Sequence, residues 1–183
     1  MTDIKKIFDE ALPPVLPPEE FKLWAYEKSF REILDNCDRE DWLLWLLSKR
    51  LGINSRLFIY IKAKLADIIR DILNSEDLYS AVDAGILYGL ETISYEEYLQ
   101  SRQISEAYQK TLSLNALTYH EPDYIRYTIQ SMASKWIYDD QGYSMYRSAI
   151  ELLNEVDPNY PIFDITIKPM MLNIIRDNTT QLN

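Results

Sequence analysis

Glycine is scarce in this sequence, with only four among 183 residues. The dipeptides Asn-Gly and Asp-Gly, which are strong signals for tight β-hairpins, do not occur. A glycine-rich phosphate-binding loop needs several closely spaced glycines, and these four are not spaced in that way. We therefore expect neither a hairpin-rich β fold nor a nucleotide-binding loop.

Cysteine and histidine each occur once, as Cys37 and His120. A single cysteine excludes an intrachain disulfide, which fits a reducing compartment. A Cys-His nucleophile pair would require these two residues to meet, and the His120-Glu121 dipeptide lacks the second histidine of a zinc-protease helix. We interpret Cys37 as a small buried hydrophobe and His120 as a loop residue, and we expect no catalytic residue, cofactor or metal.

Long apolar runs are also missing. The longest, Trp42 to Leu47, has six residues, whereas a membrane-spanning helix needs about 20. The N-terminal segment is amphipathic and has no apolar stretch of signal-peptide length. A cytoplasmic protein that does not enter membranes is the expectation.

Positive charge is in the minority, with 19 basic against 29 acidic residues and a formal charge of −10. A strongly acidic protein repels the phosphate groups of nucleic acids and of anionic membranes. Opposite charge speeds the encounter between proteins and selects partners. A basic protein is therefore the expected partner.

Helical periodicity fills most of the chain, and apolar residues make up 47% of it, enough for one packed core. The sequence predicts an all-α single domain, residues 1–183, with eight or nine helices in an irregular bundle or a short helical-hairpin array. Its parts are an N-terminal helix with a proline-rich linker (1–18), a helical core (19–156), and a loop with a C-terminal helix (157–183).

Several boundaries follow from local signals. One continuous stripe predicts a helix from Glu19 to Cys37, and Asp38 or Asp41 could cap a central, fully apolar helix that ends at Gly52. Asn54 or Ser55 should cap the next helix. The glycines at 85 and 89 indicate a close helix crossing or a frayed end, and Ser94 with Glu97 forms a capping-box pattern for a helix that reaches Leu117. Residues 162–167 could form a short strand, and Pro169 suits the first turn of a last helix.

The charge pattern offers a candidate site. No basic residue lies between Arg70 and Arg102, and tyrosines are interleaved with the acids of this interval. Tyrosine is enriched in binding interfaces, and carboxylates would meet Lys or Arg on a partner. The candidate partner-binding residues are Asp71, Glu76, Asp77, Tyr79, Asp83, Tyr88, Glu91, Tyr95, Glu96, Glu97 and Tyr98. A weaker patch comprises Tyr138, Asp139, Asp140, Tyr143 and Tyr146. The alternative is that these faces only keep the protein soluble.

A specific stretch lies near the start of the core. It reads Cys37-Asp38-Arg39-Glu40-Asp41-Trp42-Leu43-Leu44-Trp45-Leu46. It resembles the Cys-x-Arg-x-Asp-Trp-x-Leu-Trp-Leu stretch of a family of helical bacterial and phage proteins, which are described as immunity proteins of toxin–immunity systems. The resemblance covers roughly half of the chain and implies a helical fold and the neutralisation of a protein partner. Its structural core comprises Trp24, Cys37, Asp41, Trp42, Leu44, Trp45 and Leu46.

Three functions remain open at this point. The first is an immunity-type protein that blocks a basic partner through its acidic, tyrosine-rich surface. The second is a structural or phage-associated helical protein that self-associates, since tyrosine-rich faces also serve homo-oligomers. The third is an enzyme with a carboxylate-held metal at Glu96-Glu97 or Asp139-Asp140. Adjacent helical residues point about 100° apart, so neither pair forms a ready-made chelate.

Overall fold

The structure is a computed structural model and describes residues 4–11, 17, 19–70, 75–118, 128–132, 135, 143–157, 159, 161, 163–180 and 182. Side chains are not described for residues 112–118, 143–145 and 156. Within the described ranges the chain is helical and contains no strand, which confirms the predicted all-α single domain. The predictions for Asp71, His120, Glu121, Tyr138, Asp139 and Asp140, and for the side chain of Tyr143, lie outside the described residues.

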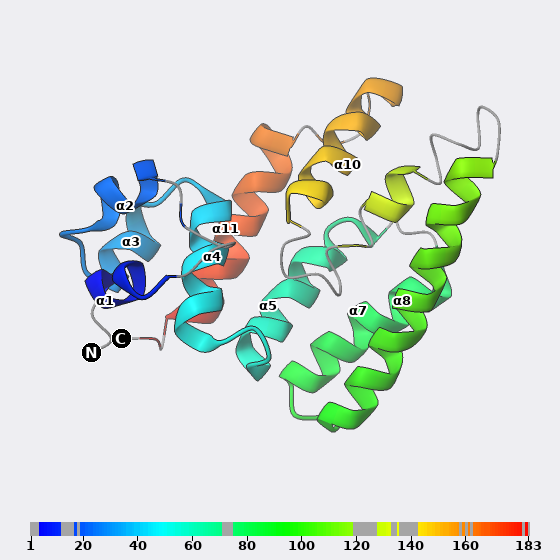
Figure 1. The fold of residues 1–183 in the computed structure, drawn as a ribbon, viewed down its shortest axis with the longest axis horizontal. Helices are drawn as coiled ribbons and strands as arrows, with labels where there is room; N and C mark the ends of the chain where they lie inside the picture. The colour runs from blue at the N-terminus through cyan, green and yellow to red at the C-terminus, as the bar shows by residue number, and fades with distance from the viewer. Residues whose placement is uncertain are drawn as a thin grey trace.

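The helices are arranged in three groups along the long axis of the molecule (Figure 1). Helices α1 to α3 lie at one end, α4, α5, α10 and α11 occupy the middle, and the α7–α8 hairpin forms the other end. The bounds are α1 Ile4–Asp9, α2 Glu19–Ala25, α3 Phe30–Asn36, α4 Glu40–Leu51, α5 Arg56–Asp67, α7 Glu76–Gly89, α8 Tyr95–Thr118, α10 Tyr143–Val156, η1 Phe163–Ile167 and α11 Lys168–Thr179.

The predicted helix from Glu19 to Cys37 is wrong, because the chain forms two helices there. Ser29 begins α3 with a complete capping box: its backbone N–H donates to Glu32 Oε2 (2.8 Å), and its hydroxyl accepts from the Glu32 N–H (3.2 Å). This Ser-x-x-Glu pattern favours a helix start over continuation. The break turns Leu23 outward, 74% exposed, and buries Phe21 and Ala25 instead.

Helix α4 is the buried central helix that its apolar run predicts. Leu43, Leu46 and Leu47 are fully buried, and the chain leaves the helix at Gly52 with a φ of +82°. The predicted cap is wrong, since Arg39 occupies the N-cap position and its side chain makes no capping hydrogen bond to a backbone N–H of the helix. Asp41 lies inside the first turn, where a carboxylate is favoured by the positive end of the helix dipole.

Helix α7 packs most extensively against α5 and α8. Ser55 caps α5 by accepting from the Phe58 N–H (3.3 Å), one of the two predicted caps. A Cβ at position 85 would lie 2.7 Å from Ala63 Cβ, and one at position 89 would overlap the Tyr60 side chain. The two glycines therefore mark a close crossing of α5 and α7, one of the two predicted readings.

The last segment differs from the prediction. Residues 163–167 form a π-helical turn, η1, which runs directly into α11, so the predicted strand at 162–167 is wrong. Pro169 lies in the first turn of α11, as predicted. Buried Phe163 and Ile167 attach η1 to the main core, and helical wrapping brings both onto one side without any partner strand.

An aromatic cluster joins the N-terminal helices to α4. Phe21 stacks on Trp42 with ring centroids 4.9 Å apart, and Phe8 stacks on Trp45 at 5.5 Å. Trp24 lies 6.1 Å from Trp42 and is partly buried. Such ring pairs contribute about 0.5–1.5 kcal/mol each beyond their buried area. The two tryptophans of α4 are thus core residues, as the surrounding leucines predict.

Candidate functional site

The candidate acidic interval forms the α7–α8 hairpin, whose helices run antiparallel. The Ser105 hydroxyl of α8 donates to the carbonyl of Asp77 (2.5 Å) at the start of α7, and the rings of Tyr88 and Tyr95 meet at the other end. Asp77 and Glu91 are 14 residues apart, which corresponds to about 20 Å along a helix. Apart from Asp83 in the middle of α7, the described acids of this interval therefore lie at two opposite ends of the hairpin.

Two of these acids are paired with arginines of the preceding helical segment. Arg70 donates to Asp83 and to Asp67, and Arg56 lies 3.3 Å from the Glu91 carboxylate. The hydrogen bonds and charges of Asp83 raise the pKa of Arg70. Both acids have exposed side chains, so each pair is worth little on its own.

Glu97 has a structural role at the start of α8. Its carboxylate accepts from the Ser94 N–H (2.7 Å), and the Ser94 hydroxyl accepts from the Glu97 N–H (3.2 Å), which confirms the predicted capping box. Hydrogen bonds to the carboxylate from the Ser94 backbone and from its side chain lower the pKa of Glu97. The adjacent Glu96 is exposed and takes no part in the cap.

Three exposed carboxylates remain uncompensated. Within the described ranges, no Lys or Arg forms an ion pair with Glu76, Asp77 or Glu96. Glu76 and Asp77 lie in the first turn of α7, and Glu96 lies in the first turn of α8. Acidic side chains are favoured in the first turn of a helix by its dipole, so their position at both helix starts does not require a partner cation.

The tyrosines of the interval contribute more to packing than to the surface. Tyr88 and Tyr98 are only 8% and 5% exposed, and their rings stack at 5.5 Å. Tyr95 packs on both rings and is partly buried. Tyr79 packs against the main core, where it is partly buried under the Arg70 guanidinium. The sequence pattern predicts these rings as interface residues, and the burial of Tyr88 and Tyr98 contradicts that prediction for both. Their helical spacing from Ala84 and Leu99, which belong to the same cluster, is the signal that could have placed them inside.

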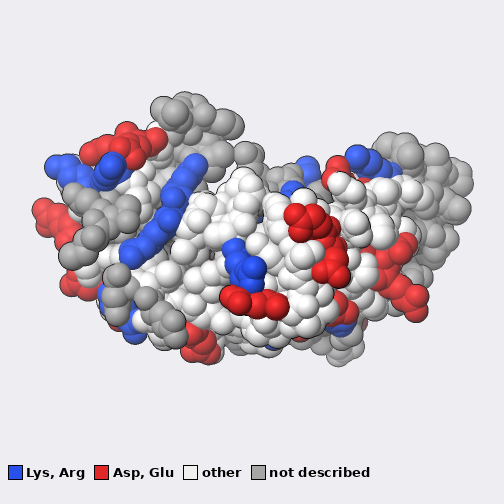
Figure 2. Space-filling view, turned by 90° about the horizontal axis from the view of Figure 1, so that it is seen from below, with Lys and Arg blue, Asp and Glu red and all other residues white. Residues whose placement is uncertain are grey.

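The net charge is distributed unevenly along the molecule. Residues 1–70 contain twelve basic and twelve acidic residues, so the whole excess of ten negative charges comes from residues 71–183. On the face shown in Figure 2, acidic side chains lie on both halves, and a long strip of Lys and Arg side chains lies on the half that contains the N-terminal helices. In the weaker patch, Tyr146 is fully buried and donates to the Leu65 carbonyl (3.1 Å).

The Cys37–Leu46 stretch serves as a packing junction between α3 and α4. The Cys37 thiol is 1% exposed and lies 3.4 Å from the Arg39 carbonyl, and burial raises its pKa to about 11. Arg39 forms two hydrogen bonds with Asp41 (2.8 and 3.0 Å) and stacks over the Trp42 ring. Leu44 and Leu46 are buried. A thiol with a raised pKa is a poor nucleophile at neutral pH, so this geometry suits packing better than catalysis.

Few features among the described residues could bind a metal ion or a small ligand. Among the described residues, no three His, Cys, Asp or Glu side chains gather where they could hold a metal ion. An open hollow of about 420 Å³ lies beside α2, between Leu23, Trp24, Tyr26 and Lys28. In the described part of the chain, no helix combines the length and the apolar character that crossing a membrane requires.

Comparison with known proteins adds no relative to this picture. Neither a family model, nor a curated protein, nor a solved structure matches the chain.

Proposed function

We propose that the protein is an immunity-type binding protein that neutralises a basic protein partner through the acidic surface of the α7–α8 hairpin. One observation carries the proposal: Glu76, Asp77 and Glu96 are exposed and have no ion pair with any described residue. Uncompensated carboxylates on helices leave their charge available to a partner's Lys and Arg. The resemblance of the Cys37–Leu46 stretch to immunity proteins supports the same reading.

The hairpin also provides the rigidity that such a surface needs. The Tyr88, Tyr95 and Tyr98 rings pack together behind the turn, and the glycines of α7 let it approach α5 closely. A preorganised surface loses less conformational freedom on binding than a flexible one. The tyrosines therefore stabilise the turn that joins α7 to α8, next to Glu96, and the exposed carboxylates supply the contact.

The two ends of the hairpin make different demands on a partner. Since they are about 20 Å apart, a small basic patch would meet only one of them. The α7 end, with two adjacent uncompensated carboxylates, is the stronger attractor. The Glu91 end is partly neutralised by Arg56.

The test compares two charge reversals that are matched in position. Glu76→Lys/Asp77→Lys changes the first turn of α7, and Glu19→Lys/Glu20→Lys changes the first turn of α2 by the same charge. Each variant and the unaltered protein would be used to capture partners from a lysate of the source cell, followed by elution in a salt gradient. Exposed charge pairs weaken as salt rises, so a partner held by this surface should elute at moderate salt.

A basic protein that is retained by the unaltered chain and by the α2 variant, but lost by the α7 variant, is the expected result. Equal retention by all three proteins would show that the α7 end is not the site. If only the bait itself is recovered, light scattering over a range of concentrations would test self-association. A mass that grows with concentration would then favour a homo-oligomeric structural protein.

A further inference from the structure

Arg147 of α10 contacts three different parts of the fold. Its guanidinium bonds to Glu151 of the same helix (2.8 Å), lies 3.8 Å from Asp164 of η1, and lies 3.9 Å from Glu40 of α4. It also stacks over the Phe163 ring, with the ring centroid 4.9 Å from the guanidinium carbon. One side chain therefore joins α10 and the nearby η1 to α4, whose Glu40 precedes Arg147 by 107 residues of sequence.

The partner on α4 is an unusual one. Glu40 is fully buried, whereas Arg147 is 36% exposed and Asp164 is 66% exposed. Taking a carboxylate out of water is costly unless a cation compensates it. Arg147 thus connects a buried acidic side chain of α4 to an exposed one of η1.

The distances show how firmly each contact is made. The bond to Glu151 has hydrogen-bond length, whereas the contacts with Glu40 and Asp164 are ion pairs beyond hydrogen-bond length. The contacts between elements therefore depend on charge more than on directed bonds. Such contacts break more readily than the helix itself.

The face that these contacts hold down is apolar. Tyr146, Ala149 and Ile150 of α10 are fully buried, and Tyr146 reaches the Leu65 carbonyl of α5. If α10 separated from α4 and α5, this face and the core beneath it would be exposed to solvent. Exposed apolar faces of this kind bind protein partners.

We propose that Arg147 is a charge latch that holds α10 and η1 closed over the α4–α5 core, and that breaking it opens the C-terminal segment locally. The latch is a conformational device that is independent of the acidic hairpin. It places the ion pairs of α10 with Glu40 and Asp164 at one arginine.

Hydrogen exchange of the full chain, followed by mass spectrometry, tests the latch. Arg147→Met should speed exchange in residues 146–155 and 163–167 about tenfold and leave the α7–α8 hairpin unchanged. Arg31→Met is the matched control, because Arg31 forms the same kind of bond along its own helix, to Asp35 at 2.9 Å. That variant should leave the exchange of α10 unaltered.

A second pair of variants keeps the proposal testable if Arg147→Met unfolds the protein. Asp164→Asn removes only the exposed partner and should speed exchange in the same two segments by a smaller factor. Glu40→Gln should speed exchange of α10 in the unaltered protein and have less effect when Asp164→Asn is already present, because both changes break one shared latch. Unchanged exchange in all these variants, an equal rise in every helix, or fully additive effects of Glu40→Gln and Asp164→Asn would overturn the proposal.

Discussion

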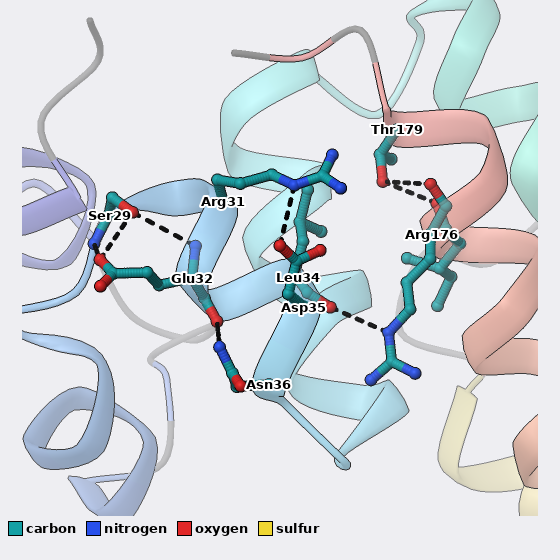
Figure 3. Close-up of polar contacts among 9 residues, drawn as sticks. Ser29, Arg31, Glu32, Leu34, Asp35, Asn36, Arg176 and Thr179 are labelled. Carbon is teal, nitrogen blue, oxygen red and sulfur yellow. Dashed lines mark hydrogen bonds and ion pairs between the residues drawn. The ribbon is translucent and has the colours of Figure 1, made fainter.

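Arg176 in the last turns of α11 donates a hydrogen bond to the carbonyl oxygen of Cys37, 2.8 Å away and 139 residues earlier in the chain. Its Nε also donates to the Leu34 carbonyl (2.9 Å), as Figure 3 shows. Both carbonyls lie at the end of α3, where the last turn of a helix has no internal donors left. The C-terminal helix therefore caps an N-terminal helix and ties the two ends of the fold together.

Arg176→Met should destabilise the protein by about 2–3 kcal/mol, because it removes two charge-assisted bonds and leaves two carbonyls without a donor. Arg176→Lys should reduce the free energy of unfolding by about half as much, because a lysine cannot donate to both carbonyls in the geometry of a guanidinium group. Urea unfolding measures both values. Lys168→Met in the first turn of α11 serves as the control and should be close to neutral. A loss for Arg176→Met no larger than for this control would show that the cap contributes nothing.

Gly85→Ala and Gly89→Ala should each destabilise the protein by about 1–3 kcal/mol, although alanine is the better helix former. The added methyl group would meet Ala63 in the first case and Tyr60 in the second, so α5 and α7 would have to move apart. Thermal or urea unfolding gives the free energy of unfolding. Ala63→Gly in the Gly85→Ala background removes the clashing atom and should recover part of the loss. If Gly85→Ala proves stabilising, the two helices are not in close contact.

The two capping boxes predict a pH dependence of stability. Hydrogen bonds from Ser29 and Ser94 lower the pKa of Glu32 and Glu97 below the ordinary value of 4.5. A carboxylate with a depressed folded-state pKa stabilises the fold at pH values above 4.5, and this contribution is lost as pH falls through the folded-state pKa. Glu32→Gln/Glu97→Gln should therefore be less stable than the unaltered protein at pH 7.

The difference between these two proteins should shrink between about pH 5 and pH 3 and vanish in acid. Urea midpoints at several pH values measure it. Glu155→Gln, at an exposed carboxylate of α10, should follow the unaltered protein throughout. A gap that stays constant with pH would mean that the charge of the two caps is irrelevant to stability.

The Cys37 thiol should be almost inert in the folded protein. With a pKa of about 11, on the order of one thiol in a thousand is ionised at pH 8, and the side chain is 1% exposed. Reaction with a chromogenic disulfide reagent should be about a hundredfold slower in buffer than in denaturing urea. Equal rates in both solutions would indicate an accessible, reactive cysteine and would reopen its role in chemistry.

Helix starts and ends that depend on neighbouring residues could be predicted from the sequence. The Ser94–Glu97 box, the stop at Gly52 and the first-turn Pro169 are set by neighbouring residues, so they can be found without the fold. The break between α2 and α3 had an equally local signal in Ser29 and Glu32. An apolar stripe that continued across it concealed the break, because periodicity alone does not exclude an interruption.

The candidate site was harder to predict because it depends on partners that are distant in sequence. A run without basic residues indicated the acidic hairpin, but Arg56 and Arg70 come from outside that run and neutralise two of its carboxylates. Tyr88 and Tyr98 were assigned to a surface and proved to be buried. The contacts of Arg147 and Arg176 join helices whose packing order the sequence does not contain.

The π-helical turn at η1 has a consequence for how the last helix keeps its orientation. Buried side chains recur at every fourth position from η1 to the end of α11, at Phe163, Ile167, Met171, Ile175 and Thr179. In an α-helix, each step of four residues overshoots a full turn by about 40°, so such a row would wind progressively away from the core. A π turn holds more residues, and four of them fall short of a full turn. The wide turn therefore rotates the row of buried side chains in the opposite direction at its start, which offsets part of the rotation that builds up along α11. Deleting one residue from η1 would remove this offset and turn Arg176 away from α3.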